Sequence, residues 1–319
     1  MAYQPAWVRG VETGGDRDCA ARYDAIREVV KPYTRQLCVW DLGASLGYFG
    51  LRLANEFGSV SVMVDGRPGL LDVCRENAIP TTVAMVHRLS VEDLREVSAS
   101  SSPDVVLCLN FLHHFEDWQE PLKRVLVFGG EIIIETPGRG DTGSVNYWPS
   151  QDLLDAIESE QPELIGSFPS HVTPGVQRPL YRIVRPRANL TSPYAYQGRV
   201  RRRGKHPVRA HVIESSLSAK TVTFDGHEPR PWVPGVNLWN WAQLGGAYPT
   251  RSWVACYIER AYHALDVPHG DFRPWNLILQ GDRVVAIDNG HRQSVDDAIG
   301  FADTLRWVAH PEMAWGQCA

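Results

Sequence analysis

A glycine loop between an apolar segment and a helical pattern constrains this chain more than any other feature. Residues 38–50 read CVWDLGASLGYFG, in which an apolar run leads to Asp41 and then to Gly43 and Gly47. Glycine has no Cβ, and the first turn of a helix has free N–H donors, so a ligand can lie directly against such a loop. The pattern therefore predicts a strand, a tight loop and a helix N-terminus, as found in nucleotide-binding α/β sheets.

The next predicted strand, residues 60–64, ends at a second acid, Asp65, whose carboxylate is placed to hold ribose hydroxyls. The spacing Asp41-x-Gly43-x-x-x-Gly47 differs from the Gly-x-Gly-x-x-Gly of dinucleotide-binding folds. It resembles motif I of class I S-adenosylmethionine (SAM)-dependent methyltransferases. This resemblance implies a Rossmann-like α/β fold and SAM binding by Asp41, Gly43, Gly47 and Asp65.

A further strand, residues 104–109, is followed by Asn110-Phe111-Leu112-His113-His114. In an open α/β sheet the ligand lies at the carboxyl ends of the strands, so Asn110, His113 and His114 should border the cofactor and its methyl group. The segment resembles the LHH signature of small-molecule methyltransferases. Either histidine is a candidate base for a nucleophilic hydroxyl. The alternative is that one histidine is packed and the other caps a helix.

A third predicted strand, residues 81–86, precedes two acids, Glu92 and Asp93, which are candidates for contacting the adenine amino group. That role is implied by the methyltransferase resemblance. A capping box from Ser90 to Asp93 would explain the same residues, so both interpretations stay open.

The C-terminal third carries a second motif, His269-Gly270-Asp271-Phe272-Arg273-Pro274-Trp275-Asn276, followed by the sequence IDNG at residues 287–290. In this arrangement Asp271 is a candidate proton acceptor, and Asn276 and Asp288 are candidate ligands for Mg²⁺ at the phosphates of ATP. The pattern resembles the catalytic lobe of small-molecule and sugar kinases. No glycine-rich loop precedes it, and Lys220 is a weak candidate for the strand lysine of a kinase, so we expect a degenerate lobe with little or no phosphotransfer.

The composition changes between the two motifs, where residues 199–205 form a basic run that predicts either a solvated linker or a polyanion contact. We therefore expect a methyltransferase domain at residues 1–186, a basic linker with a possible minimal small lobe at 187–228, and a smaller α+β kinase-like lobe at 229–319. This order resembles the bifunctional kinase–methyltransferases that cap O-antigen polysaccharide. It implies O-methylation of a sugar, a glycan or a phosphorylated small molecule, with an active bifunctional enzyme as an alternative.

Composition limits the remaining classes of function. The 319 residues carry a net charge of −5, which argues against nucleic acid as partner, although an RNA methyltransferase acting on a modified uridine stays an alternative through the basic run. No apolar run reaches the ~18 residues of a membrane span, and the first 15 residues look like a loosely held arm without signal-peptide character. The six cysteines lack the close pairs of a zinc site, so we expect a reducing cytoplasm.

Overall fold

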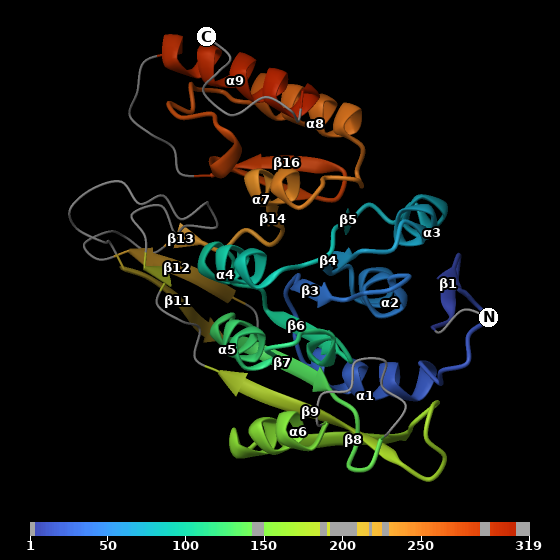
Figure 1. Ribbon diagram of the computed structural model, residues 1–319. Helices are drawn as coiled ribbons and strands as arrows, with labels where there is room; N and C mark the ends of the chain where they lie inside the picture. Colours follow the sequence, from blue (N-terminus) through green and yellow to red (C-terminus); the bar gives the residue numbers. More distant parts are fainter. Residues whose placement is uncertain are drawn as a thin grey trace.

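The computed structural model describes residues 4–141, 150–185, 190–191, 209–216, 219–224, 230–287 and 294–310. Its centre is a seven-stranded sheet with the strand order β5-β4-β3-β6-β7-β9-β8 (Figure 1). Five strands are parallel, and β9 and β8 complete the sheet in antiparallel fashion. The strands are β3 (Cys38–Leu42), β4 (Val60–Asp65), β5 (Thr82–Val86), β6 (Val105–Leu109), β7 (Gly130–Glu135), β8 (Glu163–Pro169) and β9 (Gln177–Arg185).

Helices cover both faces of this sheet, which is why its parallel strands are mostly apolar. Alternate residues of one strand enter different cores: Val39 packs with α1, α2 and α3, whereas Trp40 packs with α4, α5 and α6. The helices are α1 (Ala20–Val30), α2 (Tyr48–Phe57), α3 (Gly69–Asn77), α4 (Val91–Ser100), α5 (Gln119–Val127) and α6 (Ser150–Ser159). The Rossmann-like α/β fold predicted from the sequence is confirmed.

The N-terminal arm differs from the loosely held segment expected from its polar composition. Residues Ala6–Val8 (β1) and Val11–Thr13 (β2) form a hairpin, and Asn77 at the end of α3 bonds Arg9 N and Trp7 O at 2.8 Å each. A Cβ on Gly15 would lie 2.3 Å from Pro5 N, so the start of the described chain packs tightly against this glycine. Long-range packing therefore orders a segment that has no local structural signal.

The C-terminal unit, here the described residues 230–287 and 294–310, is a smaller α+β assembly. A three-stranded antiparallel sheet, β14-β15-β16, is accompanied by two short helices and two longer ones. Its elements are β14 (Val236–Asn237), α7 (Leu238–Gln243), α8 (Arg251–His263), the 3-10 turn η2 (Pro274–Asn276), β15 (Leu277–Gln280), β16 (Arg283–Ala286) and α9 (Ser294–Ala309).

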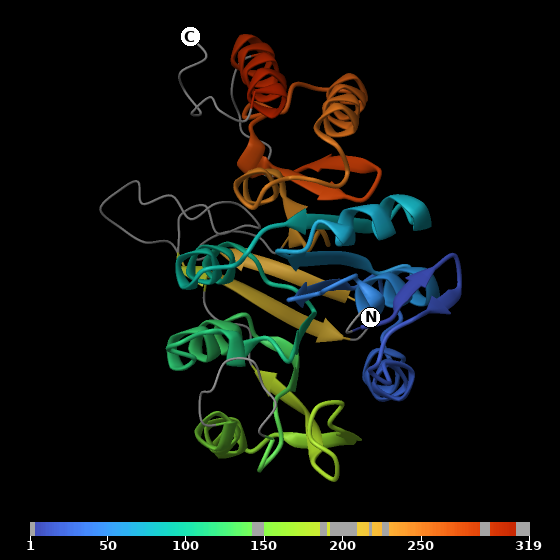
Figure 2. The same cartoon turned by 45° about the vertical axis from the view of Figure 1, so that its right-hand side comes forward.

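This unit packs against the β5 edge of the central sheet. Figures 1 and 2 both show α8 and α9 at one end of the molecule, beyond β5, with β8 and α6 at the opposite end. One hydrophobic cluster contains Val83 of β5 together with Trp241 and Leu279 of the C-terminal unit. The β15–β16 turn touches the segment before β5 so closely that a Cβ on Gly281 would lie 1.1 Å from Pro80 O. The residues on either side of the predicted boundary at 186 thus bury apolar surface against each other.

A further four-stranded sheet has the strand order β10-β11-β12-β13. Its strands are β10 (Leu190–Thr191), β11 (Arg209–Ser216), β12 (Ala219–Phe224) and β13 (Arg230–Pro231). Lys220 falls in β12, whereas the basic run 199–205 and Asp288 lie outside the described residues. Within the described part of the chain, no helix combines the length and apolar character needed to cross a bilayer.

Candidate functional site

A cavity of about 710 Å³ opens at the carboxyl ends of β3, β4 and β6 and of the segment after β5; we call it the strand-end cavity. This is the edge at which parallel α/β sheets bind ligands. Its lining includes five of the predicted cofactor or catalytic residues, namely Gly43, Asp65, Glu92, Asn110 and His114. The structure thus brings these five residues to one cavity, although the strands that build it are distant in the sequence.

Asp65 closes the glycine loop onto β4. Its Oδ2 accepts a hydrogen bond from Ser45 N at 2.7 Å, and its Oδ1 accepts one from Arg67 N at 2.8 Å. Gly43 has φ +72°, and a Cβ at this position would lie 2.8 Å from the Phe111 ring, so only glycine fits this turn. Carboxylate oxygens accept more than one hydrogen bond each, so Asp65 keeps acceptor capacity for a ligand in the cavity.

Asp41 and Gly47 support the loop from behind and do not line the cavity. Asp41 is 1% exposed, and its Oδ2 accepts a hydrogen bond from Gly50 N at 3.3 Å. Burial raises the pKa of Asp41 to about 7, against the lowering effect of this amide. Gly47 has φ +77° and begins α2, and a Cβ there would lie 2.9 Å from Met63 Sδ. These residues shape the loop, which is a different role from the direct contact the sequence suggested.

The two acids considered for adenine separate clearly. Asp93 completes a capping box: its Oδ2 accepts from Ser90 N at 2.8 Å, and Ser90 Oγ accepts from Asp93 N. The Oδ2 of Asp93 also lies 2.9 Å from His87 Nε2. Glu92 takes no part in this capping box and lines the strand-end cavity. It is therefore the acid that is placed to contact a ligand.

The adjacent histidines experience different surroundings, although their ring centroids are 4.2 Å apart. His114 is exposed at the cavity, and its charged neighbours are Asp65, Arg67 and Arg88. His113 is buried, and burial together with His114 and Arg178 lowers its pKa to about 3. The pKa of His114 is also lowered, chiefly by desolvation. His113 is therefore neutral at physiological pH, which leaves its lone pair available to accept a proton.

The N-terminal segment supplies two cavity residues, Gln4 and Arg17. Gln4 is 4% exposed, and its Oε1 has no hydrogen-bond partner among the described residues. Arg17 forms a buried ion pair with Glu135, which Arg22 also contacts at 2.9 Å. Two guanidinium groups thus share one carboxylate beside the cavity. Gln4 was missed from the sequence because nothing in a polar arm marks a buried side chain.

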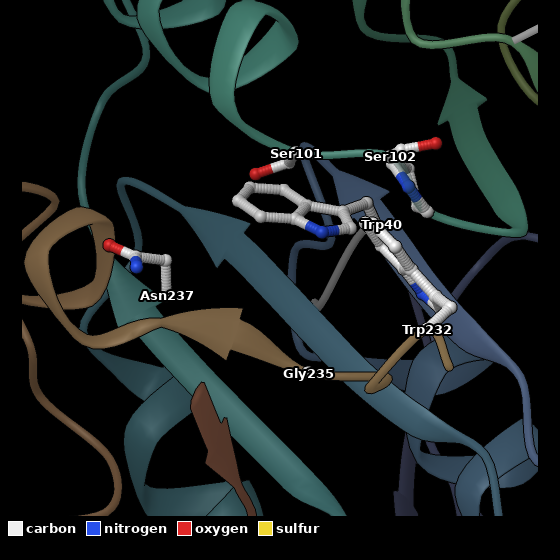
Figure 3. Close-up of a pocket in the computed structure, with 7 residues that line it drawn as sticks. Trp40, Ser101, Ser102, Trp232, Gly235 and Asn237 are labelled. Atoms are coloured by element: carbon white, nitrogen blue, oxygen red, sulfur yellow. The ribbon is translucent and has the colours of Figure 1, made fainter. Parts of the chain in front are cut away.

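A second hollow lies where the C-terminal unit meets the sheet (Figure 3). It is lined by Trp40 of β3 and by Trp232, Gly235 and Asn237 from the other side. Its volume is about 10 Å³, which is enough for one water molecule. It is therefore a packing defect at the junction and cannot hold a cofactor.

The C-terminal motif forms a compact turn around Asp271. The Nδ2 of Asn276 donates to Asp271 O at 2.9 Å and to Asp271 Oδ2 at 3.0 Å, and Arg273 Nε lies 2.9 Å from Asp271 Oδ1. Asp297 of α9 supports the turn by accepting from Gly270 N at 2.8 Å. The structure thus brings Asp271 and Asn276 together as predicted. The third member, Asp288, lies outside the described residues, and no group of three or more metal-capable side chains occurs among those described.

Residues 40–134 match the family model described as a methyltransferase domain. This segment runs from β3 through β7 and contains the glycine loop, Asp65 and the histidine pair. Residues 40–134 are a methyltransferase domain. The prediction of a SAM-dependent methyltransferase is thereby confirmed.

The methyltransferase domain has named relatives. The O-antigen chain terminator bifunctional methyltransferase/kinase WbdD of Escherichia coli is 28% identical over 190 residues, which cover 54% of this chain and 26% of that protein. This chain therefore matches only about a quarter of the length of its curated relative. A solved structure of WbdD with the kinase inhibitor LY294002 is 20% identical, with a TM-score of 0.46, over 86% of this chain and 76% of that one. The N-terminal domain of EvdMO1 with SAH and D-fucose is 20% identical, with a TM-score of 0.42, over 55% and 88%.

Proposed function

We propose that the chain O-methylates a sugar or glycan with SAM bound in the strand-end cavity. The observation that carries this proposal is the position of Asp65 at the end of β4. Its carboxylate holds the glycine loop through Ser45 N and keeps acceptor capacity for a ligand in the cavity. Support for a glycan-like acceptor comes from the 28% identity to WbdD, whose name refers to O-antigen chains. The acidic net charge disfavours the RNA alternative, and the basic run on which that alternative depended lies outside the described residues.

The residues of the cavity fit SAM at both of its ends. Asp65 suits the ribose hydroxyls, and Glu92 suits the adenine amino group, since both are acceptors at the edge where the glycine loop lies. The methionyl end of SAM is a zwitterion. The orphaned Oε1 of Gln4 is an acceptor for its ammonium group, and Arg17, one of two arginines sharing Glu135, is a cation for its carboxylate.

When bound, SAM supplies an electrophilic methyl group on a sulfonium. The chain's own contribution is to fix the acceptor beside that methyl group and to remove the acceptor's proton. Asn110 lines the cavity directly after β6, and His113 follows it in the buried 3-10 turn Leu112–His114. The neutral imidazole of His113 is in the state required of a base. His114 lies on the side of Asp65, so we assign it to the cofactor side of the cavity.

Three measurements test the proposal. Calorimetry should show SAM binding to the full chain, and mass spectrometry of small molecules that copurify with the protein should identify SAM, its product or an acceptor. Incubation with isotopically methyl-labelled SAM should then place label on an oxygen of a carbohydrate. Absence of SAM binding to a folded full-length chain would refute the proposal.

A second candidate activity concerns the C-terminal unit, for which we propose weak Mg²⁺-dependent nucleotide binding with little or no phosphotransfer. The side-chain amide nitrogen of Asn276 donates to the backbone oxygen and to Oδ2 of Asp271. This arrangement favours nucleotide binding, because it leaves the side-chain oxygen of Asn276 for a cation. The ion pair between Arg273 and Asp271 disfavours phosphotransfer, because it competes with the acceptance of a hydroxyl proton by Asp271. Part of this proposal is a cytoplasmic setting, supported by six cysteines without close pairing in the sequence.

A further inference from the structure

The loop that connects α7 to α8 pairs with the edge strand β5. Tyr248 N donates to Ala84 O and Ala84 N donates to Tyr248 O, each at 2.9 Å. Gly245 lies beside the carboxyl end of the same strand, where a Cβ added to it would be 3.1 Å from Val86 O. We call residues 245–248 the docking loop. The docking loop thus contacts β5 both at its middle and at the end that leads to the strand-end cavity.

The docking loop brings the C-terminal unit onto both faces of β5. Leu244, which leads into the loop, belongs to the hydrophobic cluster that contains Val83. Tyr248 is 5% exposed and belongs to the other cluster, together with Ala84. Successive side chains of a strand point to opposite faces, so the chain crosses the edge of β5 between Leu244 and Tyr248. A movement of β5 toward either face would therefore disturb this loop.

β5 leads directly into the wall of the strand-end cavity. The six residues that follow it, 87–92, all line the cavity. Backbone groups alternate in direction along a strand, so every second residue of β5 faces β4 and the others face the docking loop. His87 N accordingly donates to Asp65 O at 2.9 Å, on the side of β4. Val86 O lies on the other side, next to Gly245. These two neighbours connect the docking loop to the acid proposed for the ribose.

Contacts within the cavity wall hold it together as one piece. A Cβ on Gly66 would lie 3.5 Å from Arg88 Cβ, so Arg88 packs against the segment after β4. His87 Nε2 lies 2.9 Å from Asp93 Oδ2, and the same carboxylate oxygen caps α4. A displacement of Val86 would therefore shift the wall as a whole and not a single side chain.

The C-terminal motif orients the helix that leads into the docking loop. Asn237 caps α7, because its Oδ1 accepts from Trp239 N at 3.0 Å. The Nδ2 of Asn237 donates to Trp275 O at 2.7 Å. Trp275 belongs to η2, the turn that also carries Asn276. A continuous series of contacts thus runs from the C-terminal motif through α7 and the docking loop to β5.

We propose that the C-terminal unit is part of the cofactor site of the methyltransferase, with Gly245 and Tyr248 as positioning residues for the cavity wall at residues 87–92. The inference rests on the proposed binding of SAM in the strand-end cavity. It gives the C-terminal unit a role in methylation that requires no phosphotransfer. Because coupling between two equilibria is reciprocal, SAM binding must in turn strengthen the docking of the loop on β5.

Substitutions at the two ends of β5 test the inference. Gly245 has φ +92°, so Gly245→Ala strains the loop and places a Cβ against Val86 O, beside the cavity. We expect the Kd and KM for SAM to rise roughly 5- to 10-fold, with kcat at saturating SAM unchanged. Gly281→Ala is the matched control, because its Cβ would clash with Pro80 O on the same interface but before β5, away from the cavity. This control should keep the Kd for SAM.

Hydrogen exchange of the wild-type protein tests the same coupling without a substitution. The amides of Ala84 and Tyr248 donate the two hydrogen bonds between the loop and β5, so both exchange when the loop leaves the strand. Addition of SAM should slow exchange at these two amides more than at Ala264, whose amide donates to Arg260 O at the end of α8. Equal slowing at all three amides would indicate general stabilisation and would count against the inference.

The outcomes separate this inference from the proposed function. In a protein that binds SAM, an unchanged Kd in folded Gly245→Ala would overturn the inference, and so would unchanged exchange at Ala84 and Tyr248. An equal rise of the Kd in Gly281→Ala would overturn the assignment to the docking loop. If Gly245→Ala does not fold, the exchange measurement decides. Failure of the wild-type protein to bind SAM would instead refute the proposed function.

Discussion

Ala84 and Tyr248 exchange both of their backbone hydrogen bonds at 2.9 Å, although they lie in opposite halves of the sequence. Ala84 is in the middle of β5, the edge strand of the central sheet. An edge strand exposes unpaired N–H and C=O groups, which invite pairing with another chain. The C-terminal unit thus covers an edge of the methyltransferase sheet, and the two parts of the molecule should depend on each other for stability.

Gly281→Ala tests that dependence. A Cβ at this position would lie 1.1 Å from Pro80 O, so the β15–β16 turn must withdraw from β5, and we expect a loss of roughly 2–4 kcal/mol in the free energy of unfolding. Gly58→Ala is the control, because Gly58 has a similar φ of +63° but nothing within 4 Å of the added Cβ. Urea unfolding of both variants measures the difference. Equal losses of unfolding free energy in the two variants would show that the contact between Gly281 and Pro80 contributes nothing to stability.

Asp65→Ala should weaken SAM binding. The substitution removes the acceptors for Ser45 N and Arg67 N as well as those proposed for the ribose, so we expect a loss of roughly 1.5–3 kcal/mol in binding free energy. Asp72→Ala is a suitable control, since Asp72 is an exposed acid on the following helix α3. Calorimetry with SAM measures both variants. Unchanged affinity in Asp65→Ala would contradict the placement of the cofactor.

Asp41→Asn should change how stability depends on pH. Burial raises the folded-state pKa of Asp41 from its ordinary value of 3.8 to about 7, so the folded state binds more protons between these values. In the wild type this group therefore lowers the free energy of unfolding as pH rises from about 4 to about 7. The variant lacks this loss, and its stability relative to wild type should rise with pH by at most ~1.4 kcal/mol per unit. Urea unfolding across this pH range, without SAM, would reveal a constant difference if Asp41 titrated normally.

His113 should remain neutral across the physiological range. Its pKa is lowered from 6.5 to about 3, so its ring proton resonances should not shift between pH 5 and 8. The unfolded state binds more protons between these two pKa values, so His113 contributes stability that is lost as pH falls below about 6.5. A pH titration by NMR, with His113→Gln to assign the signal, checks the first point. A midpoint near 6.5 would be incompatible with the buried environment.

The C-terminal unit should respond weakly to Mg-ATP. We expect a small thermal shift in the wild type that disappears in Asn276→Ala, with no phosphotransfer above that of Asp271→Ala. Asp282→Ala provides a control, because Asp282 is an exposed acid in the β15–β16 turn. Robust phosphotransfer in the wild type that vanishes in Asp271→Ala would show that the unit is an active kinase.

Local patterns were sufficient to predict much of the central sheet. The apolar runs of β3 and β4, the glycines between β3 and α2, and Asp65 at a strand end all lie within one short stretch of the sequence. Strand ends converge in any parallel sheet, so Asn110 could be placed at the cavity from its position alone.

Contacts that depend on distant segments could not be predicted in this way. Gln4 is buried where Pro5 packs on Gly15, and this contact leaves no periodic signal in the sequence. His113 and His114 look equivalent in the sequence, yet a 3-10 turn gives them different charged neighbours. The partner of Asn110, Arg178, comes from an antiparallel strand far along the chain.

The hydrophobic core shared by the two parts of the molecule separates the C-terminal motif into residues needed for folding and residues that folding does not require. Phe272, Trp275 and Leu277 are buried in the hydrophobic cluster that includes the methyltransferase sheet, whereas Asp271 remains partly exposed. A saturation library sorted only for folding and expression would thus retain the aromatic positions whether or not the unit handles a nucleotide. If such a library tolerated substitutions at Asp271 but not at Phe272, folding would require the aromatic residue and not the acid. Asp271 would then be retained for binding or chemistry only.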